Sequence, residues 1–290
     1  MSNIILDKSK HGWWKSAVFY QIYPKSFQDT DGDGVGDLRG IISRLDYLQR
    51  LGIDGIWLSP VCQSPQVDNG YDVADYYDID PAYGTLEDFK KLLDMAHSMG
   101  IRVIMDQVLN HSSDECVWFQ ESRKSKDNPY RNFYIWQPPK PDGSEPNNWG
   151  NIFLEGKGSA WEWDETTQQY YLHYYSKHMP DLNWDYQPLR EEVYSMMRWW
   201  MDMGVDGFRE DVITYISKKE GLPNDYLFPI YKGMPNYNHG PHIHEYLMEF
   251  KKDVLQHYDC MTLAEAPLVS PRLALKYIKE DETGQMDMMI

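Results

Sequence analysis

A unit of helix, glycine and strand recurs along the chain. In each copy an amphipathic segment ends at a glycine, and a short apolar run then ends at a polar side chain. The copies cover residues 44–59, 92–106 and 196–211. A glycine in this place suits the left-handed cap that closes a helix, and a continuously apolar run suits a buried parallel strand. The pattern therefore predicts successive αβ units.

Two more strands are predicted, at residues 17–22 and 261–265, and residues 245–255 have helical periodicity before the second one. Alternation of this kind predicts an α/β fold, either a (β/α)8 TIM-type barrel or an open doubly wound sheet. We favour the barrel because polar and acidic residues recur where the strands end. In addition, no glycine-rich phosphate-binding motif follows a strand.

A long insertion separates the third strand from its helix. Residues 112–188 are rich in Trp and Tyr and show little helical periodicity, and the segment is far longer than an ordinary connection. We predict three parts: residues 1–111 with strands 1–3, an inserted domain at 112–188 that forms one wall of a cleft, and residues 189–290 with strands 4–6. Five strands are complete by Glu265 and a sixth begins near residue 285. The expected barrel is incomplete, as in a truncated chain.

Composition excludes some classes of partner. The 28 Lys and Arg residues against 45 Asp and Glu residues give a net charge of −17, which argues against binding to nucleic acid or to an anionic membrane. No apolar stretch approaches the roughly 18 residues of a membrane helix. The N-terminus lacks the pattern of a signal peptide, and three widely spaced cysteines favour a reducing compartment. We therefore expect a cytoplasmic protein, and its oligomeric state stays open.

Charged residues at one strand end indicate chemistry. In the sequence Gly-Phe-Arg-Glu-Asp, Arg209 and Asp211 point to the same side because strand side chains alternate. An adjacent Arg favours the ionised form that a carboxylate nucleophile requires. A structural ion pair is an equally good interpretation of this pair alone.

Other strand ends carry further polar groups. Asp106, Asn110 and His111 follow the third strand and could hold a hydroxylated ligand, although each alone could be structural. Glu265 ends a later strand. If Asp211 and Glu265 face each other, they form the nucleophile and acid of a retaining glycoside hydrolase, which lie about 5–5.5 Å apart.

An acidic loop offers a candidate metal site. Residues 29–37 place the carboxylates of Asp29, Asp31, Asp33 and Asp37 on a glycine-rich loop, which suits a hard cation such as Ca²⁺ or Mg²⁺. The loop begins like an EF-hand, but its twelfth position is Gly40 and a strand precedes it. An acidic turn that binds no ion is the alternative.

These motifs together resemble the alpha-amylase family of glycoside hydrolases (family 13), and within it the group of oligo-1,6-glucosidases and dextran glucosidases. The resemblance extends from about Trp13 to the last residue and is carried by residues 106–111, 180–184, 207–211 and Glu265. It implies an incomplete (β/α) barrel with an inserted domain B, Asp211 as nucleophile and Glu265 as general acid/base.

The resemblance also implies substrate and metal contacts. Its substrate-binding positions are Asp68, Tyr71, Asp106, His111 and Arg209, where Asp68 and Tyr71 bind the terminal non-reducing glucose. Its structural calcium loop uses Asp29, Asp31, Asp33 and Asp37 through their side chains and Val35 through its carbonyl group. Val212, after the nucleophile, accompanies acceptance of α-1,6 linkages in relatives.

The expected partner is therefore an oligosaccharide with α-1,6 linkages, and α-1,4 linkages are a second possibility. Trehalose-6-phosphate hydrolases and sucrose isomerases share Val212, so both activities stay open. An inactive relative that acts as a binding module is the alternative of another class.

Two departures from the family qualify this expectation. The third catalytic carboxylate, in an Asn-His-Asp motif, would lie beyond Ile290, so we predict that the 290 residues alone are inactive. Glu210 stands where relatives usually carry an apolar residue such as Met. It should face the helices, where it needs a cationic or hydrogen-bonding partner.

Overall fold

The computed structural model describes residues 12–153, 158–227, 230–279 and 283–290. The N-terminal residues on which the expectation of no signal peptide rests lie outside this part.

The predicted α/β fold is confirmed as a curled parallel sheet. Its strand order is β1-β2-β5-β9-β10-β11, so neighbours in the sheet follow one another along the chain. Among the described residues, the edge strands β1 and β11 each pair with one strand only, and the barrel is half built. The strands are β1 (Phe19–Ile22), β2 (Gly55–Leu58), β5 (Arg102–Val108), β9 (Gly207–Asp211), β10 (Met261–Ala264) and β11 (Met288–Met289).

Helices connect these strands, and glycines cap two of them as predicted. Gly52 and Gly204 cap α3 and α6 with φ values of 84° and 115°. After α4 the cap is Met99, and Gly100 follows with φ of 76°. The helices are α1 (Pro24–Phe27), α2 (Leu38–Ser43), α3 (Leu45–Leu51), α4 (Leu86–Ser98), α5 (Val117–Ser122), α6 (Gln187–Met203), α7 (Met234–Tyr237), α8 (Ile243–Asp253) and α9 (Pro271–Ala274).

Apolar faces of the helices form the main core against the outer side of the sheet. Trp200 of α6 is fully buried, its ring meets Phe89 of α4 at 5.3 Å, and its Nε1 donates to the carbonyl oxygen of Tyr76 at 2.9 Å. Burial of one large apolar side chain contributes roughly 1.5–3 kcal/mol. A separate cluster on Ile104, Met261 and Leu263 includes Trp14 from the N-terminal side.

Gly207 allows β9 to approach β10 closely. Its φ is 153°, and a Cβ atom added there would lie 2.1 Å from the carbonyl oxygen of Met261. Any other residue would force the two strands apart. The glycine therefore holds Arg209 and Asp211 in register with β10.

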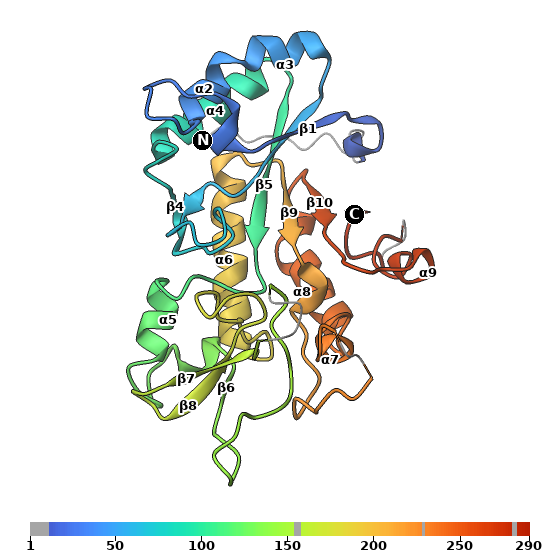
Figure 1. The fold of residues 1–290 in the computed structure, drawn as a ribbon. Helices are drawn as coiled ribbons and strands as arrows, with labels where there is room; N and C mark the ends of the chain where they lie inside the picture. Colours follow the sequence, from blue (N-terminus) through green and yellow to red (C-terminus); the bar gives the residue numbers. More distant parts are fainter. Residues whose placement is uncertain (1–11, 154–157, 228–229, 280–282) are drawn as a thin grey trace.

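The insertion between β5 and α6 forms a separate small layer. Strands β6 (Trp136–Gln137), β7 (Trp161–Asp164) and β8 (Gln169–Leu172) make an antiparallel sheet in the order β6-β8-β7. In Figure 1 the arrowheads of β5 and β9 point toward this layer, so it lies beyond the carboxyl ends of these strands. A bridge between His111 and Asp181 joins it to the end of β5. The predicted boundary at 188 lies in the first turn of α6, which begins at Gln187, and the division at 112 and 188 stays a prediction.

Candidate active site

Arg209 gathers three carboxyl groups at the carboxyl ends of β5, β9 and β10. Its Nη1 atom lies 2.6 Å from Asp106 Oδ1 and 2.8 Å from Asp211 Oδ1, and its Nη2 atom lies 2.7 Å from Glu265 Oε2. Asp106 and Asp211 are buried, whereas the side chain of Glu265 is 31% exposed. The structure thus brings the predicted nucleophile and acid together on one guanidinium.

The shared guanidinium limits how far apart the carboxyl groups of Asp211 and Glu265 can lie. The oxygens of Asp211 and Glu265 are separated by no more than the width of one guanidinium plus two hydrogen bonds. Retaining glycosidases place their carboxyl groups about 5–5.5 Å apart, and inverting enzymes about 6.5–9.5 Å apart. The shared guanidinium is compatible with both spacings, and retention stays a prediction.

The pKa of Asp211 is raised, whereas its neighbour Arg209 alone would lower it. Burial raises the pKa of Asp106 to about 6, although Arg209 opposes the shift. Burial also raises the pKa of Asp211 well above its usual value; Arg209 lowers it, and the charges of Asp106 and Glu265 raise it again. The positive charge of Arg209 therefore opposes the effect of burial on the pKa of Asp211 without cancelling it.

Two aromatic residues lie against Asp106 and Arg209. Trp57 Nε1 and the Tyr71 hydroxyl donate to Asp106 Oδ2 at 3.2 Å and 3.1 Å. The Arg209 guanidinium lies 5.4 Å from the Trp57 ring and 5.8 Å from the Tyr71 ring. Trp57, which the sequence reasoning did not single out, thus orients Asp106.

His111 is a neutral hydrogen-bond donor. Burial, followed by the charge of Lys218, lowers its pKa to about 3. Its Nε2 atom lies 3.2 Å from the carbonyl oxygen of Tyr71, and its Nδ1 atom lies 3.2 Å from Asn110 Nδ2. The amide donates to Nδ1, so the ring proton is on Nε2. His111 therefore links the end of β5 to the loop that carries Tyr71.

Lys218 joins three segments behind His111 and was not anticipated. Its buried Nζ atom donates to Asn110 Oδ1 at 2.8 Å and lies 2.9 Å from Asp181 Oδ2. Asp181 Oδ1 in turn accepts from the backbone N–H of Tyr174 at 3.0 Å. One ammonium group thus connects the segment after β9, the end of β5 and the inserted domain. A Lys close behind the apolar run 212–216 was the available signal.

Asp68 lies on the loop between β3 (Cys62–Gln63) and β4 (Asp75–Ile79), a hairpin that was not predicted. Tyr71 lies on the same loop. Asp72 holds the loop by accepting from the backbone N–H groups of Val67 and Asp68 at 2.8 Å and 2.9 Å. Burial, with the charge of Asp72, raises the pKa of Asp68 to about 6.

Val212 has a strained backbone beside the carboxyl groups. Its φ and ψ are 36° and 40°, a left-handed conformation that β-branched residues rarely adopt. Its N–H donates to Glu265 Oε2 at 2.9 Å. The strain therefore turns the chain directly after Asp211 and aims a donor at the predicted acid. The Val212 side chain packs in a cluster with Trp149 and Tyr237.

Glu210 faces away from the site, as expected, but its carboxyl group has no hydrogen-bond partner in the part of the chain that the structure describes. It is fully buried, and neither carboxyl oxygen has a hydrogen-bond partner among the described residues. Burial raises its pKa well above the usual value. Gln107, its register partner on β5, is also buried, and its Nε2 has no acceptor in this part of the chain. The expected cationic or hydrogen-bonding partner is thus absent from the described residues.

The acidic loop brings together part of the predicted cation site. Carboxylate oxygens of Asp29, Asp31 and Asp37 lie within 4.8 Å of one another. Asp33 is not in this group, and its Oδ1 accepts from the N–H of Val35 at 2.7 Å. Backbone N–H groups hold Asp29 in place, with Gly32 at 2.7 Å and Gly34 at 2.9 Å. The oxygen donors fit a hard cation.

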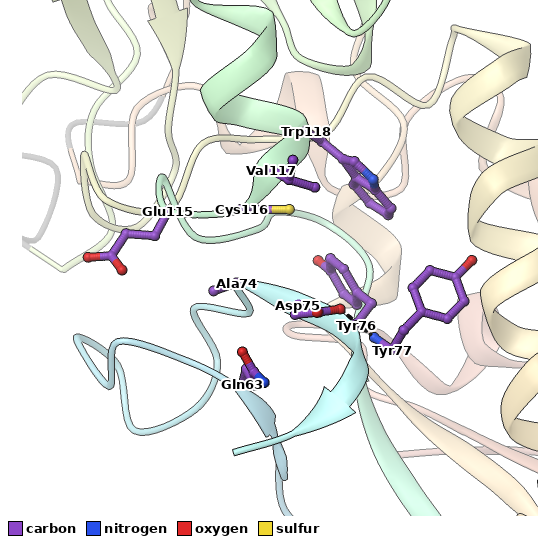
Figure 2. Close-up of a pocket in the computed structure, with 9 residues that line it drawn as sticks. All are labelled: Gln63, Ala74, Asp75, Tyr76, Tyr77, Glu115, Cys116, Val117 and Trp118. Carbon is purple, nitrogen blue, oxygen red and sulfur yellow. Dashed lines mark hydrogen bonds between the residues drawn. The ribbon is translucent and has the colours of Figure 1, made fainter. Parts of the chain in front are cut away.

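A cavity of about 390 Å³ lies elsewhere, between the β3–β4 hairpin and α5. Figure 2 shows its wall of Asp75, Tyr76, Tyr77, Cys116 and Trp118. Burial raises the pKa of the Cys116 thiol to about 11, so this thiol stays protonated. None of the residues that contact Arg209 lines this cavity.

Comparisons with known proteins agree with the geometry. Residues 21–289 match the family model described as alpha amylase, catalytic domain. The chain is 58% identical over 272 residues to an oligo-1,6-glucosidase of Heyndrickxia coagulans, covering 93% of this chain and 48% of that protein. It is 49% identical over 276 residues to a trehalose-6-phosphate hydrolase of Bacillus subtilis (strain 168), covering 95% of this chain and 48% of that protein.

Solved structures of similar proteins superpose closely on this chain. The trehalose-6-phosphate hydrolase of Bacillus licheniformis superposes with a TM-score of 0.92 at 49% identity. The trehalulose synthase of Pseudomonas mesoacidophila MX-45 superposes with a TM-score of 0.88 at 48% identity. Each comparison covers 96% of this chain and 49% of the other. The chain therefore spans about half the length of the relatives it matches.

Proposed function

The chain belongs to the alpha-amylase family, and on that basis we propose that it carries the nucleophile and acid of an exo-acting, retaining α-glucosidase. The substrates are oligosaccharides with α-1,6-linked glucose at the non-reducing end. The observation that supports this proposal is the convergence of Asp106, Asp211 and Glu265 on Arg209.

In the first proposed step Asp211 attacks the anomeric carbon of the terminal glucose. Glu265 gives its proton to the glycosidic oxygen as the bond to that oxygen breaks, and the shortened sugar leaves as an alcohol. Asp211 and glucose are then joined as an ester. The Val212 N–H, 2.9 Å from Glu265 Oε2, holds the acid in position.

In the second proposed step the ester is hydrolysed. Glu265, now ionised, removes a proton from water, and the water oxygen bonds to the anomeric carbon. Asp211 leaves as a carboxylate, and glucose is released with its original configuration. Asp106 and neutral His111 hold Tyr71 in place for the sugar, since Asp106 accepts from its hydroxyl and His111 donates to its carbonyl oxygen.

Preference for α-1,6 linkages is supported by Val212 and by the names of similar proteins, which include several oligo-1,6-glucosidases. Trehalose-6-phosphate hydrolase is the second candidate, since relatives of that name are 49% identical. Sucrose isomerisation is a third.

The test uses a chimera in which this chain replaces the matching segment of the Heyndrickxia coagulans oligo-1,6-glucosidase. We expect turnover of isomaltose to exceed that of maltose and of trehalose 6-phosphate. Asp211→Asn should lower kcat by about 10⁴-fold or more because the attacking oxygen is lost, whereas Asp75→Asn, at the outer cavity, should have no effect. Faster turnover of trehalose 6-phosphate than of isomaltose would reject the preferred substrate.

The 290-residue chain alone is proposed to be inactive. Its sequence contains no Asn-His-Asp motif, so the third carboxylate of the family has no counterpart in it. Glucose release from isomaltose by this chain, above the level of its Asp211→Asn variant, would contradict the proposal.

Three further proposals concern the setting of the enzyme. A structural Ca²⁺, or Mg²⁺, is held by the acidic loop, with Asp29, Asp31 and Asp37 as the ligands that the geometry supports best. The protein acts in the cytoplasm, which the three free and buried cysteines support. An oligosaccharide is its partner. Among the described residues, no helix is both long and apolar enough to cross a bilayer.

A further inference from the structure

A buried amide just beyond β5 lies between a lysine and the histidine of the site. Asn110 Oδ1 accepts from Lys218 Nζ at 2.8 Å, and Asn110 Nδ2 lies 3.2 Å from His111 Nδ1. The same nitrogen lies 3.4 Å from Asp181 Oδ2. All four side chains are buried, so their polar atoms depend on one another for hydrogen bonds.

The lysine allows only one orientation of the Asn110 amide. Half a turn about the last bond of the side chain would exchange the amide oxygen and nitrogen. The NH2 group would then face the ammonium group of Lys218, which has donors only, at a distance of 2.8 Å. Two donors so close would repel each other. The amide oxygen therefore points to Lys218, and the NH2 group points to His111.

This orientation selects the tautomer of His111. Because an NH2 group can only donate, the ring nitrogen Nδ1 that faces it must accept, and it carries no proton. Burial, followed by the charge of Lys218, lowers the pKa of His111 to about 3, so the ring is neutral and its one proton is on Nε2. Nε2 donates that proton to the carbonyl oxygen of Tyr71 at 3.2 Å.

The hydrogen bond from Nε2 connects the histidine to the catalytic carboxyl groups through Tyr71. The Tyr71 hydroxyl donates to Asp106 Oδ2 at 3.1 Å, and Asp106 shares the guanidinium of Arg209 with Asp211. In the other tautomer a lone pair on Nε2 would face the Tyr71 carbonyl oxygen. The hydrogen bond that holds the backbone of Tyr71 would then be lost.

We propose that Asn110 is a positioning residue: oriented by Lys218, it fixes His111 in the tautomer that holds Tyr71 beside the catalytic carboxyl groups. The consequence for catalysis rests on the proposed function, whereas the tautomer does not. Asn110 acts through His111 and Tyr71, so the requirement at this position is a group that accepts from Lys218 and donates to a ring nitrogen. An aspartate has nearly the same size but cannot donate when it is ionised.

The first experiment locates the ring proton by side-chain nitrogen NMR of the 290-residue chain at pH 7, where the signal that His111→Gln removes identifies His111. We expect a proton on Nε2 and none on Nδ1. Asn110→Asp should place a proton on Nδ1, because Lys218 keeps the new carboxyl group ionised and a carboxylate only accepts. A proton on Nδ1 in the unsubstituted chain, or none there in the Asn110→Asp chain, would overturn the proposal.

The second experiment measures hydrolysis of isomaltose by the chimera described above. Asn110→Asp should lower kcat/KM about tenfold, as expected for one disturbed hydrogen bond, with most of the loss in KM because the proposed role of Tyr71 is to bind the terminal glucose. Asn132→Asp, at an exposed side chain of the inserted domain, is the matched control and should leave both KM and kcat unchanged.

The two experiments separate the inference from the proposed function. An unchanged kcat/KM in Asn110→Asp, with a proton present on Nδ1, would overturn the positioning role of Asn110 alone. If the unsubstituted chimera does not hydrolyse isomaltose while the parent enzyme does, the proposed function fails, and the role of Asn110 in catalysis fails with it. The NMR result still decides the tautomer of His111 in that case.

Discussion

At the scale of single residues, two neighbours of the nucleophile depart from ordinary protein chemistry in opposite ways. Val212 adopts a strained backbone conformation and thereby aims its N–H at Glu265. Glu210 has a regular place in β9, but its buried carboxyl group lacks a hydrogen-bond partner among the described residues. The strain at Val212 serves the site, whereas the burial of Glu210 lowers the stability of the sheet.

We predict that Glu210→Met stabilises the chain at pH 7 by about 1–3 kcal/mol because an unpartnered polar group is removed from the core. The folded-state pKa of Glu210 is raised above its unfolded value. The contribution of Glu210 is therefore most favourable below the unfolded pKa and is lost as the pH rises. Urea unfolding should show a small difference between variant and parent near pH 4 and a larger one at pH 7.

Glu220→Met, at a side chain that is 87% exposed, is the control and should not show this pH-dependent gain. A Glu210→Met chain that is less stable than the parent at pH 7 would mean that Glu210 has a stabilising partner.

At the scale of elements, the inserted domain is connected to the barrel by a buried polar network. Lys218, Asn110 and Asp181 come from three segments and meet in a region without free solvent access. Removal of one partner from such a network leaves the others without compensation. Lys218 therefore couples the position of the insertion to that of His111.

We predict that Lys218→Met destabilises the chain by about 3–5 kcal/mol because the charge of Asp181 is left buried and unpaired. The adjacent Lys219, which is exposed, offers the matched control Lys219→Met. Urea unfolding of both variants measures the difference. Adding Asp181→Leu to the Lys218 variant should restore part of the loss, and additive losses would show that the two groups are independent.

Contacts between neighbouring segments could be predicted from the sequence, whereas contacts between distant segments could not. The helix–glycine–strand units predicted three strands of the sheet and apolar runs predicted two more, and each of these strands pairs with the next one along the chain. The β3–β4 hairpin and the Lys218 network were missed. Lys218 and Asn110 are 108 positions apart, and such a contact leaves no local pattern. Asp106 was predicted to hold the ligand, but its pairing with Arg209 required the register of β5 and β9.

At the scale of the whole molecule, the acidic loop connects α1 to α2. Asp37 caps α2 by accepting from the N–H of Gly40 at 2.7 Å and also accepts from Thr30 at 2.8 Å. A cation bound by Asp29, Asp31 and Asp37 would therefore join the end of the loop that follows α1 to the end that begins α2. Binding there should stabilise the chain as a whole.

We predict that Ca²⁺ at a hundredfold excess over its Kd raises the free energy of unfolding by about 2.7 kcal/mol. Calorimetric titration and thermal unfolding measure this. Asp31→Asn should abolish the effect, whereas Asp33→Asn should retain most of it because Asp33 lies outside the carboxylate group. No heat and no shift in Tm on addition of Ca²⁺ would show that the loop is an acidic turn.

The order of the strands has a consequence for biosynthesis. Because β1, β2, β5, β9, β10 and β11 are neighbours in the order in which they are made, each strand leaving the ribosome finds its docking edge already in place. The β3–β4 hairpin and residues 112–188 interrupt this sequence, and each forms an antiparallel sheet that pairs within itself. The nascent chain can thus fold progressively, with its acidic centre assembled once β10 has joined β9.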